Sequence, residues 1–259
     1  MKPSPLRRLL LSAVVLLAVL WTVDTAAAVH TERRISAEVR ADEDIDQSPR
    51  VTVGGLPHLG ALVTHVVPTV VVEAGDVQVD GIGTANLRTE IRDLELTRDR
   101  VLSGEIIGAP ASVIARTVRL DGVALGTRIG VTDLDIAHPT DISPAAQPAT
   151  EARLTGTPPG FDRPVTVYVR LRIKGPDLTM TPYRLVGVPE DRTDEVRSIF
   201  TWRLRTEDLP LPTRVDKVFC SGGSIYLESR QRNVVVGETP ILPVGPGPGA
   251  LPGAGAPPS

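Results

Sequence analysis

The residues best suited to catalysis or metal binding in this chain are four histidines and a single cysteine. The histidines are His30, His58, His65 and His138. His58 and His65 can share one face of a helix, but two turns separate them, which is too far for joint metal ligation without further ligands. No cysteine or carboxylate cluster accompanies them in the sequence. We therefore predict no metal site.

The single cysteine, Cys220, excludes an intramolecular disulfide and any site built from several thiolates. It alternates with Val218, which favours a small core residue over a nucleophile. The run Ser221-Gly-Gly-Ser224 is typical of a turn, and Gly81-Ile-Gly83 lacks the third glycine of a dinucleotide-binding loop. We predict no catalytic residue, no cofactor and no enzyme activity. A hydrolase or transferase with scattered catalytic groups is the alternative.

Composition narrows the range of partners. The chain has 259 residues, a net charge of −3 and 3% aromatic residues, so it forms one large or two small domains with a sizeable core. A nucleic-acid-binding protein should carry a basic face and usually stacking aromatics. We therefore expect no nucleic-acid partner.

The N-terminus has the features of an export signal. Lys2, Arg7 and Arg8 precede the apolar run 9–23, and Ala26-Ala-Ala28 follows it. A basic segment, an apolar segment and small residues in this order are typical of a signal peptide, here with cleavage after Ala28.

The alternative is an uncleaved signal anchor. Residues 9–23 as a helix reach only about 22 Å, whereas residues 9–29 span the ~30 Å hydrocarbon core at the cost of submerging Asp24. In both cases the basic flank stays cytoplasmic, so the rest of the chain is exported to the periplasm or cell envelope.

The following segment predicts a short helix, a strand and a second helix. Ile35 and Val39 lie four residues apart within 29–47, as on a short helix beside the membrane. A strand at 51–53 ends at two glycines. From Pro57, aliphatic residues recur at helical spacing until Pro68 ends the pattern: Leu59, Leu62, Val63, Val66 and Val67.

From residue 69 the hydrophobic period becomes two, which predicts an antiparallel sheet. Alternating valines lead to a turn pair at Asp80-Gly81, and Val118 and Leu120 lead to another at Asp121-Gly122. The clearest strand is 165–173, with arginines on the face opposite its aliphatic residues. Those aliphatic residues are Val165, Val167, Val169, Leu171 and Ile173.

The C-terminal third predicts a helix, a hairpin and a tail. Asp194 is placed to cap a helix running to Leu204, and strands at 215–219 and 225–227 flank the Gly-Gly turn. The predicted organisation is a signal peptide or anchor over 1–28, one α+β domain over 29–237, and a disordered Pro/Gly-rich tail over 238–259.

The order of these elements resembles the actinobacterial LmeA-like phospholipid-binding family over roughly residues 30–236. The best local match is Val51, Val53, Gly55, Pro57 and Leu59, followed by the Leu-Pro segment at 209–212 and the closing hairpin. His58 departs from the family pattern, in which an aromatic residue usually follows the proline.

This resemblance implies a fold related to the tubular lipid-binding (TULIP) superfamily. In that fold a curved antiparallel sheet, here a half-barrel, wraps an aliphatic helix and leaves an apolar groove. The resemblance also implies phospholipid binding and a role in making mannose-containing envelope lipoglycans.

We therefore predict an exported protein that binds phospholipid or a lipid-linked glycan precursor at the inner membrane. An envelope protein partner or a homodimer is left open. The alternative is a structural or accessory protein of an envelope glycosyltransferase or transport complex, with a filled core. The predicted groove walls are Leu59, Leu62, Val63, Val66, Val67, Val165, Val167, Val169, Leu171 and Ile173.

Overall fold

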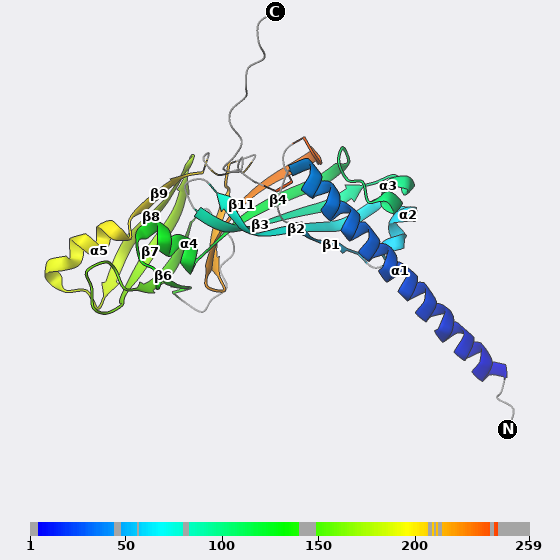
Figure 1. The fold of residues 1–259 in the computed structure, drawn as a ribbon, viewed down its shortest axis with the longest axis horizontal. Coiled ribbons are helices and arrows are strands. Elements are labelled where there is room, and N and C mark those ends of the chain that lie inside the picture. Colours follow the sequence, from blue (N-terminus) through cyan, green and yellow to red (C-terminus); the bar gives the residue numbers. More distant parts are fainter. Residues whose placement is uncertain are drawn as a thin grey trace, which may run out of the picture. The chain divides into compact units, whose positions relative to one another are not determined.

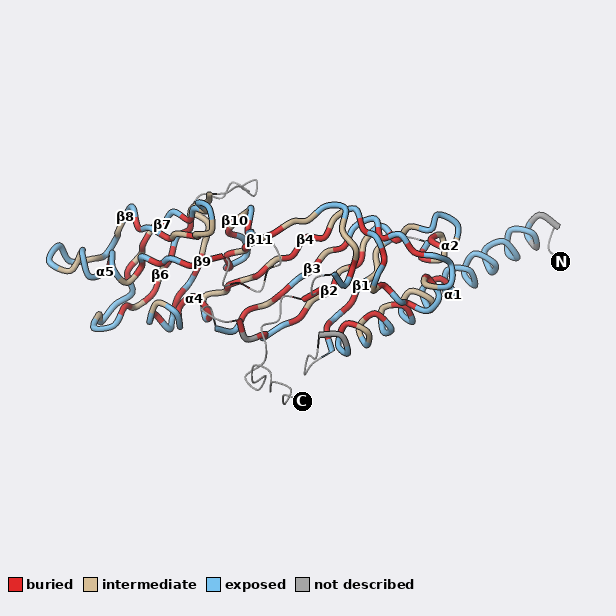
Figure 2. Tube along the Cα trace, turned by 90° about the horizontal axis from the view of Figure 1, so that it is seen from above, coloured by how far each residue is buried: buried red, intermediate tan, exposed pale blue. Residues whose placement is uncertain are grey.

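The computed structural model describes residues 5–43, 48–55, 57–79, 83–139, 149–206, 209, 211, 214–238 and 241–242. Within these residues the chain is α+β, with one long N-terminal helix, few further helices and two sheets. The larger sheet is antiparallel and curled (Figure 2). The predicted fold class is confirmed.

The chain divides into two compact units. Unit 1 comprises residues 1–73, 89–114 and 231–241, and unit 2 comprises residues 74–88, 115–230 and 242–259. Four strands of the larger sheet, β2, β3, β4 and β11, have residues in both units.

Unit 1 is dominated by α1 (Pro5–Glu43), a continuous helix of 39 residues and about 58 Å. Its second half lies against β1, η1 and α3, whereas its first half extends beyond them (Figure 1). Ile35 and Val39 are buried, which confirms the predicted helix around them; residues 44–47 lie outside the described residues. The short elements of unit 1 are β1 (Arg50–Gly54), η1 (His58–Gly60), α2 (Ala61–Thr64) and α3 (Arg98–Ser103).

The larger sheet has the strand order β1-β2-β3-β4-β11-β10. The predicted closing hairpin is confirmed, because β10 pairs antiparallel with β11 around Gly222 and Gly223. The predicted turn at residues 80–81 lies outside the described residues. The remaining bounds are β2 (Val66–Val79), β3 (Gly83–Glu95), β4 (Pro110–Asp121), β10 (Lys217–Ser221) and β11 (Ser224–Val235).

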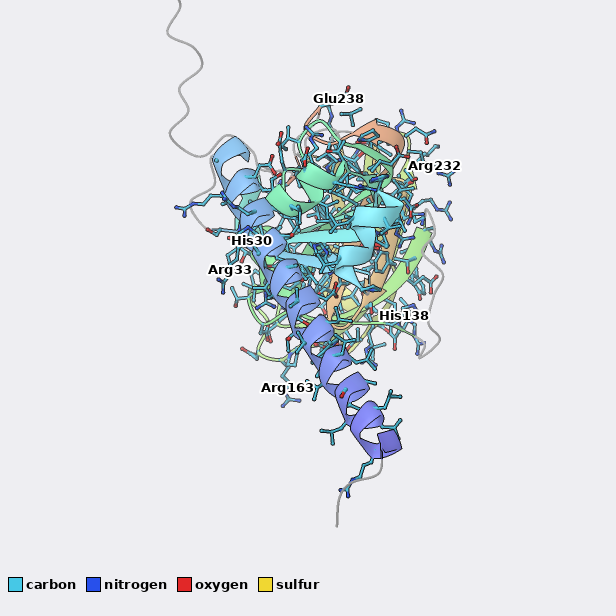
Figure 3. All side chains as sticks on the ribbon, turned by 90° about the vertical axis from the view of Figure 1, so that its right-hand side faces the viewer. His30, Arg33, His138, Arg163, Arg232 and Glu238 are labelled. Atoms are coloured by element: carbon cyan, nitrogen blue, oxygen red, sulfur yellow. The ribbon has the colours of Figure 1, made fainter. Side chains whose placement is uncertain are left out.

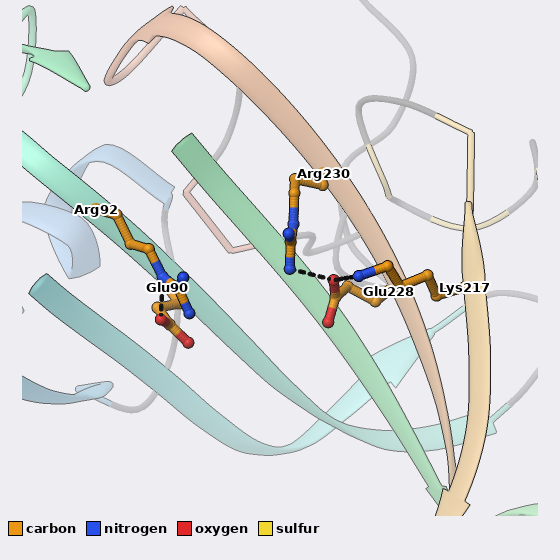
Figure 4. Close-up of polar contacts among 5 residues, drawn as sticks. All are labelled: Glu90, Arg92, Lys217, Glu228 and Arg230. Atoms are coloured by element: carbon orange, nitrogen blue, oxygen red, sulfur yellow. Dashed lines mark hydrogen bonds and ion pairs between the residues drawn. The ribbon is translucent and has the colours of Figure 1, made fainter. Parts of the chain in front are cut away.

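The strands of this sheet alternate between a buried and a polar side, as an antiparallel sheet with one wet face requires. In β3, Ile91 is fully buried while its neighbours Glu90 and Arg92 form an ion pair at 2.6 Å. In β11, Glu228 accepts hydrogen bonds from Lys217 at 3.4 Å and from Arg230 at 2.9 Å (Figure 4). Partly exposed pairs of this kind add little to stability.

The helix predicted from Pro57 to Val67 is much shorter than expected. Helical structure covers only η1 and α2, and His65 ends α2 with a positive φ of 58°. Val66 and Val67 already belong to β2, which continues through Pro68. Two adjacent β-branched residues favour extended backbone, and they outweigh a spacing pattern that spans only three turns. The long helix of unit 1 is therefore α1, and not the segment that follows Pro57.

Unit 2 contains the second sheet, with strand order β5-β6-β7-β8-β9. Strand β10 lies against β6 and β7. The sheet's bounds are β5 (Asp135–Ala137), β6 (Ala149–Gly156), β7 (Val165–Lys174), β8 (Asp177–Val186) and β9 (Trp202–Arg205). The helices of unit 2 are α4 (Gly122–Ile129), η2 (Glu190–Arg192) and α5 (Thr193–Ile199).

Strand β7 confirms the strongest strand prediction, and two further predictions in unit 2 were wrong. Asp121 does not form a hairpin turn: its carboxylate accepts a hydrogen bond from Ala124 N at 2.9 Å and caps α4. An Asp-Gly pair occurs at the start of a helix as readily as in a turn, because the Asp side chain accepts hydrogen bonds from the first N–H groups of the helix. Asp194 lies in the first turn of α5 rather than at its cap, and Leu204 lies in β9.

The packed chain reaches into the segment predicted as a tail. Ile241 and Leu242 are buried, and Thr89 donates a hydrogen bond to the Ile241 carbonyl at 2.5 Å. The other residues of the predicted tail beyond Glu238 lie outside the described residues.

Candidate functional site

One face of α1 docks on unit 1. Thr31, Ile35 and Val39 are buried and lie four residues apart, which places them on the same side of the helix. Asp24 lies seven residues before Thr31 on that side and is also buried, at 5% exposure. The docked face therefore begins at an acidic residue inside the segment predicted as an export signal.

The Asp24 carboxylate caps the start of η1. Its two oxygens accept hydrogen bonds from His58 N at 2.9 Å and Leu59 N at 2.7 Å. The first N–H groups of a helical turn have no partner within the turn, so a carboxylate from another element satisfies them. Hydrogen bonds to a charged group contribute about 1.5–3 kcal/mol each.

The His58 side chain extends this contact. Its Nε2 lies 3.1 Å from the Thr31 hydroxyl, and His58 is 4% exposed. Burial lowers the pKa of His58, and the negative charges of Asp24 and Glu32 oppose this effect without reversing it. The imidazole is consequently a neutral packing group at pH 7, with its ring held against α1.

Three more polar contacts follow along α1. Glu32 accepts a hydrogen bond from Val53 N at 2.9 Å, and Glu38 accepts one from Ile106 N at 3.1 Å. Ser36 donates to the Pro49 carbonyl at 2.7 Å. Each contact joins an α1 side chain to backbone of another unit 1 segment, so α1 is an integral part of this unit.

The motif residues that carry the family resemblance converge on the same contact. Val51 is buried and pairs with Val72, and Val53 bonds to α1 as described. Gly55 has φ +109°, and a Cβ there would lie 2.8 Å from the ring of Pro68. Pro57 then precedes η1, and Leu59 N reaches Asp24. The motif thus positions η1 beside α1.

The first half of α1 is exposed and apolar. Every described residue from Leu9 to Val23 is exposed, with Trp21 at 66%. Leu9–Ala41 is long and apolar enough to include a membrane-spanning stretch, and an export signal near the N-terminus would meet the same criterion.

A shallow hollow on α1 is lined only by residues of this helix, from Trp21 to Arg33. A single helix cannot enclose a lipid, so this hollow is not a lipid-binding pocket. Figure 3 shows His30 and Arg33 on the outer side of α1.

The five predicted wall residues between 59 and 67 do not share one helical face. Leu59, Leu62 and Val66 are half-buried, Val67 is buried, and Val63 is 78% exposed. Their residues divide among η1, α2 and β2, all in unit 1. Their role in lipid binding stays a prediction.

The five predicted wall residues in β7 share the buried face of the second sheet in unit 2. Ile173 is half-buried, and the other four, Val165, Val167, Val169 and Leu171, are at most 1% exposed. A filled core and a lipid-lined interior both require such burial, so their lipid contact also stays a prediction. The two predicted sets belong to different units.

Trp202 adds a polar atom to the β7 face. Leu171 pairs with Met180 on β8, and Met180 pairs with Trp202 on β9, so the three side chains share one face. Trp202 is 8% exposed, and within the described residues its indole Nε1 is buried without a hydrogen-bond partner. A buried N–H without an acceptor costs free energy, which a ligand oxygen would recover.

The remaining reactive side chains do not form a cluster in the part of the chain that the structure describes. Cys220 is buried, and burial raises the pKa of its thiol to about 11, so it is uncharged at neutral pH. Among the described residues, no three His, Cys, Asp or Glu side chains lie together as a metal site would need. Ser221 and Ser224 flank the β10–β11 turn, as predicted.

The sequence reasoning missed the docking residues Asp24, Thr31, Glu32 and Glu38. In the sequence alone, Asp24 stands out only as a residue that a membrane span would submerge. A signal was present: extending the Ile35 and Val39 spacing backward along one helix places Thr31 and Asp24 on the same face. The partners of Asp24, Glu32 and Glu38 are backbone N–H donors, which no side-chain motif reveals.

Comparison with protein families gives a match to the LmeA-like phospholipid-binding model over residues 22–230. Comparisons with curated proteins and with solved structures give no match. The matched range covers most of the chain and contains the docked part of α1, the Val51–Leu59 motif and strands β1–β10. The chain therefore belongs to the LmeA-like phospholipid-binding family.

Proposed function

We propose that this protein is exported to the cell envelope and binds a phospholipid, or a lipid-linked envelope glycan precursor, on an apolar sheet face without catalysing a reaction. Membership of the phospholipid-binding family carries this proposal. The apolar face of β7 to β9 in unit 2, with the Trp202 N–H on it, is the proposed contact.

Lipid binding of this kind needs no reactive side chain. Removing an acyl chain from water is favourable by about 0.8 kcal/mol per CH₂, but relative to a bilayer the gain nearly cancels. A carrier therefore needs an apolar surface that matches the chain in length. The N–H of Trp202 would orient the lipid by donating to an ester carbonyl or phosphate oxygen.

The N-terminal segment supports export. Lys2, Arg7 and Arg8 precede the exposed apolar part of α1, so the positive-inside rule leaves this flank in the cytoplasm. The chain beyond the apolar part of α1 then lies on the outer side of the inner membrane, where a lipid-linked precursor would be met.

The two tryptophans of the chain allow a direct test. In the full-length Trp21→Phe variant, Trp202 is the only tryptophan. We would reconstitute this variant in nanodiscs of dibrominated phosphatidylglycerol, whose bromines quench indole fluorescence on contact. The proposal predicts quenching relative to nanodiscs of unbrominated lipid.

The matched control is Trp202→Phe, in which Trp21 reports only on lipid around α1. Quenched Trp21 together with unquenched Trp202 would overturn the proposal and favour an accessory protein with a filled core. That alternative keeps the same fold and the same membrane contact but places no lipid against the second sheet.

A further inference from the structure

Helix α1 has two halves that face different surroundings. From Leu9 to Val23 all described residues are exposed and mostly apolar, whereas from Asp24 onward one face is buried on unit 1. The helix is continuous across this boundary. A cleaved export signal does not need to continue into a helix that packs on the folded protein. The docked half therefore favours retention of α1 over its removal by cleavage.

Cleavage after Ala28 would remove part of the docked face. Ala27 and Ala28 are half-buried, and Asp24 is the acceptor for both His58 N and Leu59 N. Losing it would leave two backbone N–H groups of η1 without their carboxylate partner. The family match also begins at residue 22, before this cleavage position.

The polar side chains at the boundary suit a bilayer. Thr22 donates a hydrogen bond to the Val19 carbonyl at 2.8 Å, and Thr25 donates to the Trp21 carbonyl at 2.9 Å, so both hydroxyls are satisfied within α1. Asp24, the one acidic residue here, is already bonded to backbone. Residues 9–29 measure about 31 Å along the helix, close to the ~30 Å hydrocarbon core.

The groups around this boundary fit the membrane–water interface. The exposed His30 and Arg33 follow residue 29 within about one turn of α1, where the span ends. These basic and polar groups suit the level of lipid head groups.

Two further apolar side chains lie on elements joined to the same boundary. Val63 on α2 is 78% exposed and Leu102 on α3 is 56% exposed. Helix α2 directly follows η1, which Asp24 holds, and α2 contacts α3. The tip of unit 1, defined as η1, α2 and α3, is therefore fixed to α1 at Asp24, directly after the apolar half of the helix ends.

We propose that α1 is retained in the mature protein, and that Asp24 holds the tip of unit 1 against the outer leaflet so that Val63 and Leu102 contact the bilayer. The occupant of this surface is the lipid bilayer itself. The inference goes beyond the proposed function, because it requires no lipid inside unit 2.

The test uses full-length protein in a Cys220→Ala background with single cysteines carrying the environment-sensitive dye NBD. Reporters at Val63→Cys and Leu102→Cys are compared with Leu16→Cys inside the apolar half of α1. The control, Arg40→Cys, is exposed and lies about 24 Å along α1 from Asp24. Vesicles contain phosphatidylcholine and phosphatidylglycerol with or without doxyl-labelled lipid as quencher.

The proposal predicts blue-shifted, quenched emission at positions 16, 63 and 102, and water-like, unquenched emission at position 40. Quenching at 16 without quenching at 63 and 102 would overturn the tip contact. Absence of quenching at 16, or a mature protein of which the intact mass begins at Val29, would overturn retention of α1. Trp202 quenching is measured separately, so these failures differ from failure of the proposed function.

A variant at Asp24 tests the link between helix and tip. Asp24→Leu removes the acceptor for His58 N and Leu59 N while keeping α1 apolar. We expect quenching to be lost at 63 and 102 and kept at 16. Unchanged quenching at all three positions would contradict the role of Asp24. Asp24→Asn, which keeps one acceptor oxygen, should retain more of the tip signal.

Discussion

Asp24 and His58 are the residues through which α1 and the Val51–Leu59 motif meet. The Asp24 carboxylate accepts a hydrogen bond from the backbone N–H of His58. The imidazole of His58 lies against Thr31, which is about two turns after Asp24 on α1. A charged and a titratable side chain therefore form the centre of the contact. Their chemistry makes the contact sensitive to pH.

We expect the α1–η1 contact to loosen as pH falls below about 6.5, the ordinary pKa of histidine. Burial lowers the pKa of folded His58, with Asp24 and Glu32 opposing, so the unfolded chain binds the proton more readily. The stability contribution is present above the unfolded pKa and is lost as pH falls through the folded pKa. Hydrogen exchange of residues 57–64 at pH 7.5 and 5.5 measures it.

His58→Gln, which has no titrating side chain, is the control for this measurement. It should show the same exchange rate, corrected for intrinsic chemistry, at both pH values. An equal pH dependence in the wild type and His58→Gln would show that another group is responsible.

Gly55 gives a second prediction at the residue scale. Its φ of +109° disfavours any side chain, and a Cβ would meet Pro68 at 2.8 Å. We expect Gly55→Ala to lower the free energy of unfolding by about 1–3 kcal/mol. Gly83 has φ +95° with open space around its Cβ position, so Gly83→Ala should cost less. Equal losses in urea denaturation would show that the contact with Pro68 is unimportant.

At the scale of elements, strands were more predictable than short helices. Five alternating aliphatic residues identify β7, because a period of two is maintained over ten residues. The segment 57–67 matched a helical spacing over only three turns, and β-branched Val66 and Val67 joined β2 instead. Asp121 caps α4, since an Asp-Gly pair alone does not distinguish a turn from a helix start.

A substitution on the buried face of β7 distinguishes a lipid-lined interior from a filled core. If lipid occupies that face, the larger side chain in Val167→Phe fills part of the lipid's space. Trp202 quenching by brominated lipid should then fall, with little loss of stability. In a filled core the same change overpacks the interior and costs about 1–3 kcal/mol. Arg172→Phe, on the exposed face of β7, should change neither quantity. Lost stability with unchanged quenching would contradict the lipid-lined interior.

For the whole molecule, the N-terminal apolar helix, the α+β class and the family could be predicted from sequence. The basic, apolar and alanine segments follow one another locally, and the alternation of the strands is a local property too. The contacts of the docked face of α1 could not be predicted, because its carboxylates bind backbone N–H groups of residues 21 to 68 positions away. The division into two units likewise depends on contacts between distant segments.

The proposed function requires that a phospholipid occupies the buried face of the second sheet in unit 2. Photo-crosslinking tests it most directly, with the full-length protein in membranes containing a phosphatidylglycerol that carries a photoactivatable acyl chain. We expect cross-linked peptides from β7 to β9 as well as from α1, with fewer β7–β9 products in Val167→Phe. Cross-links confined to α1, with none in residues 165–205, would contradict it.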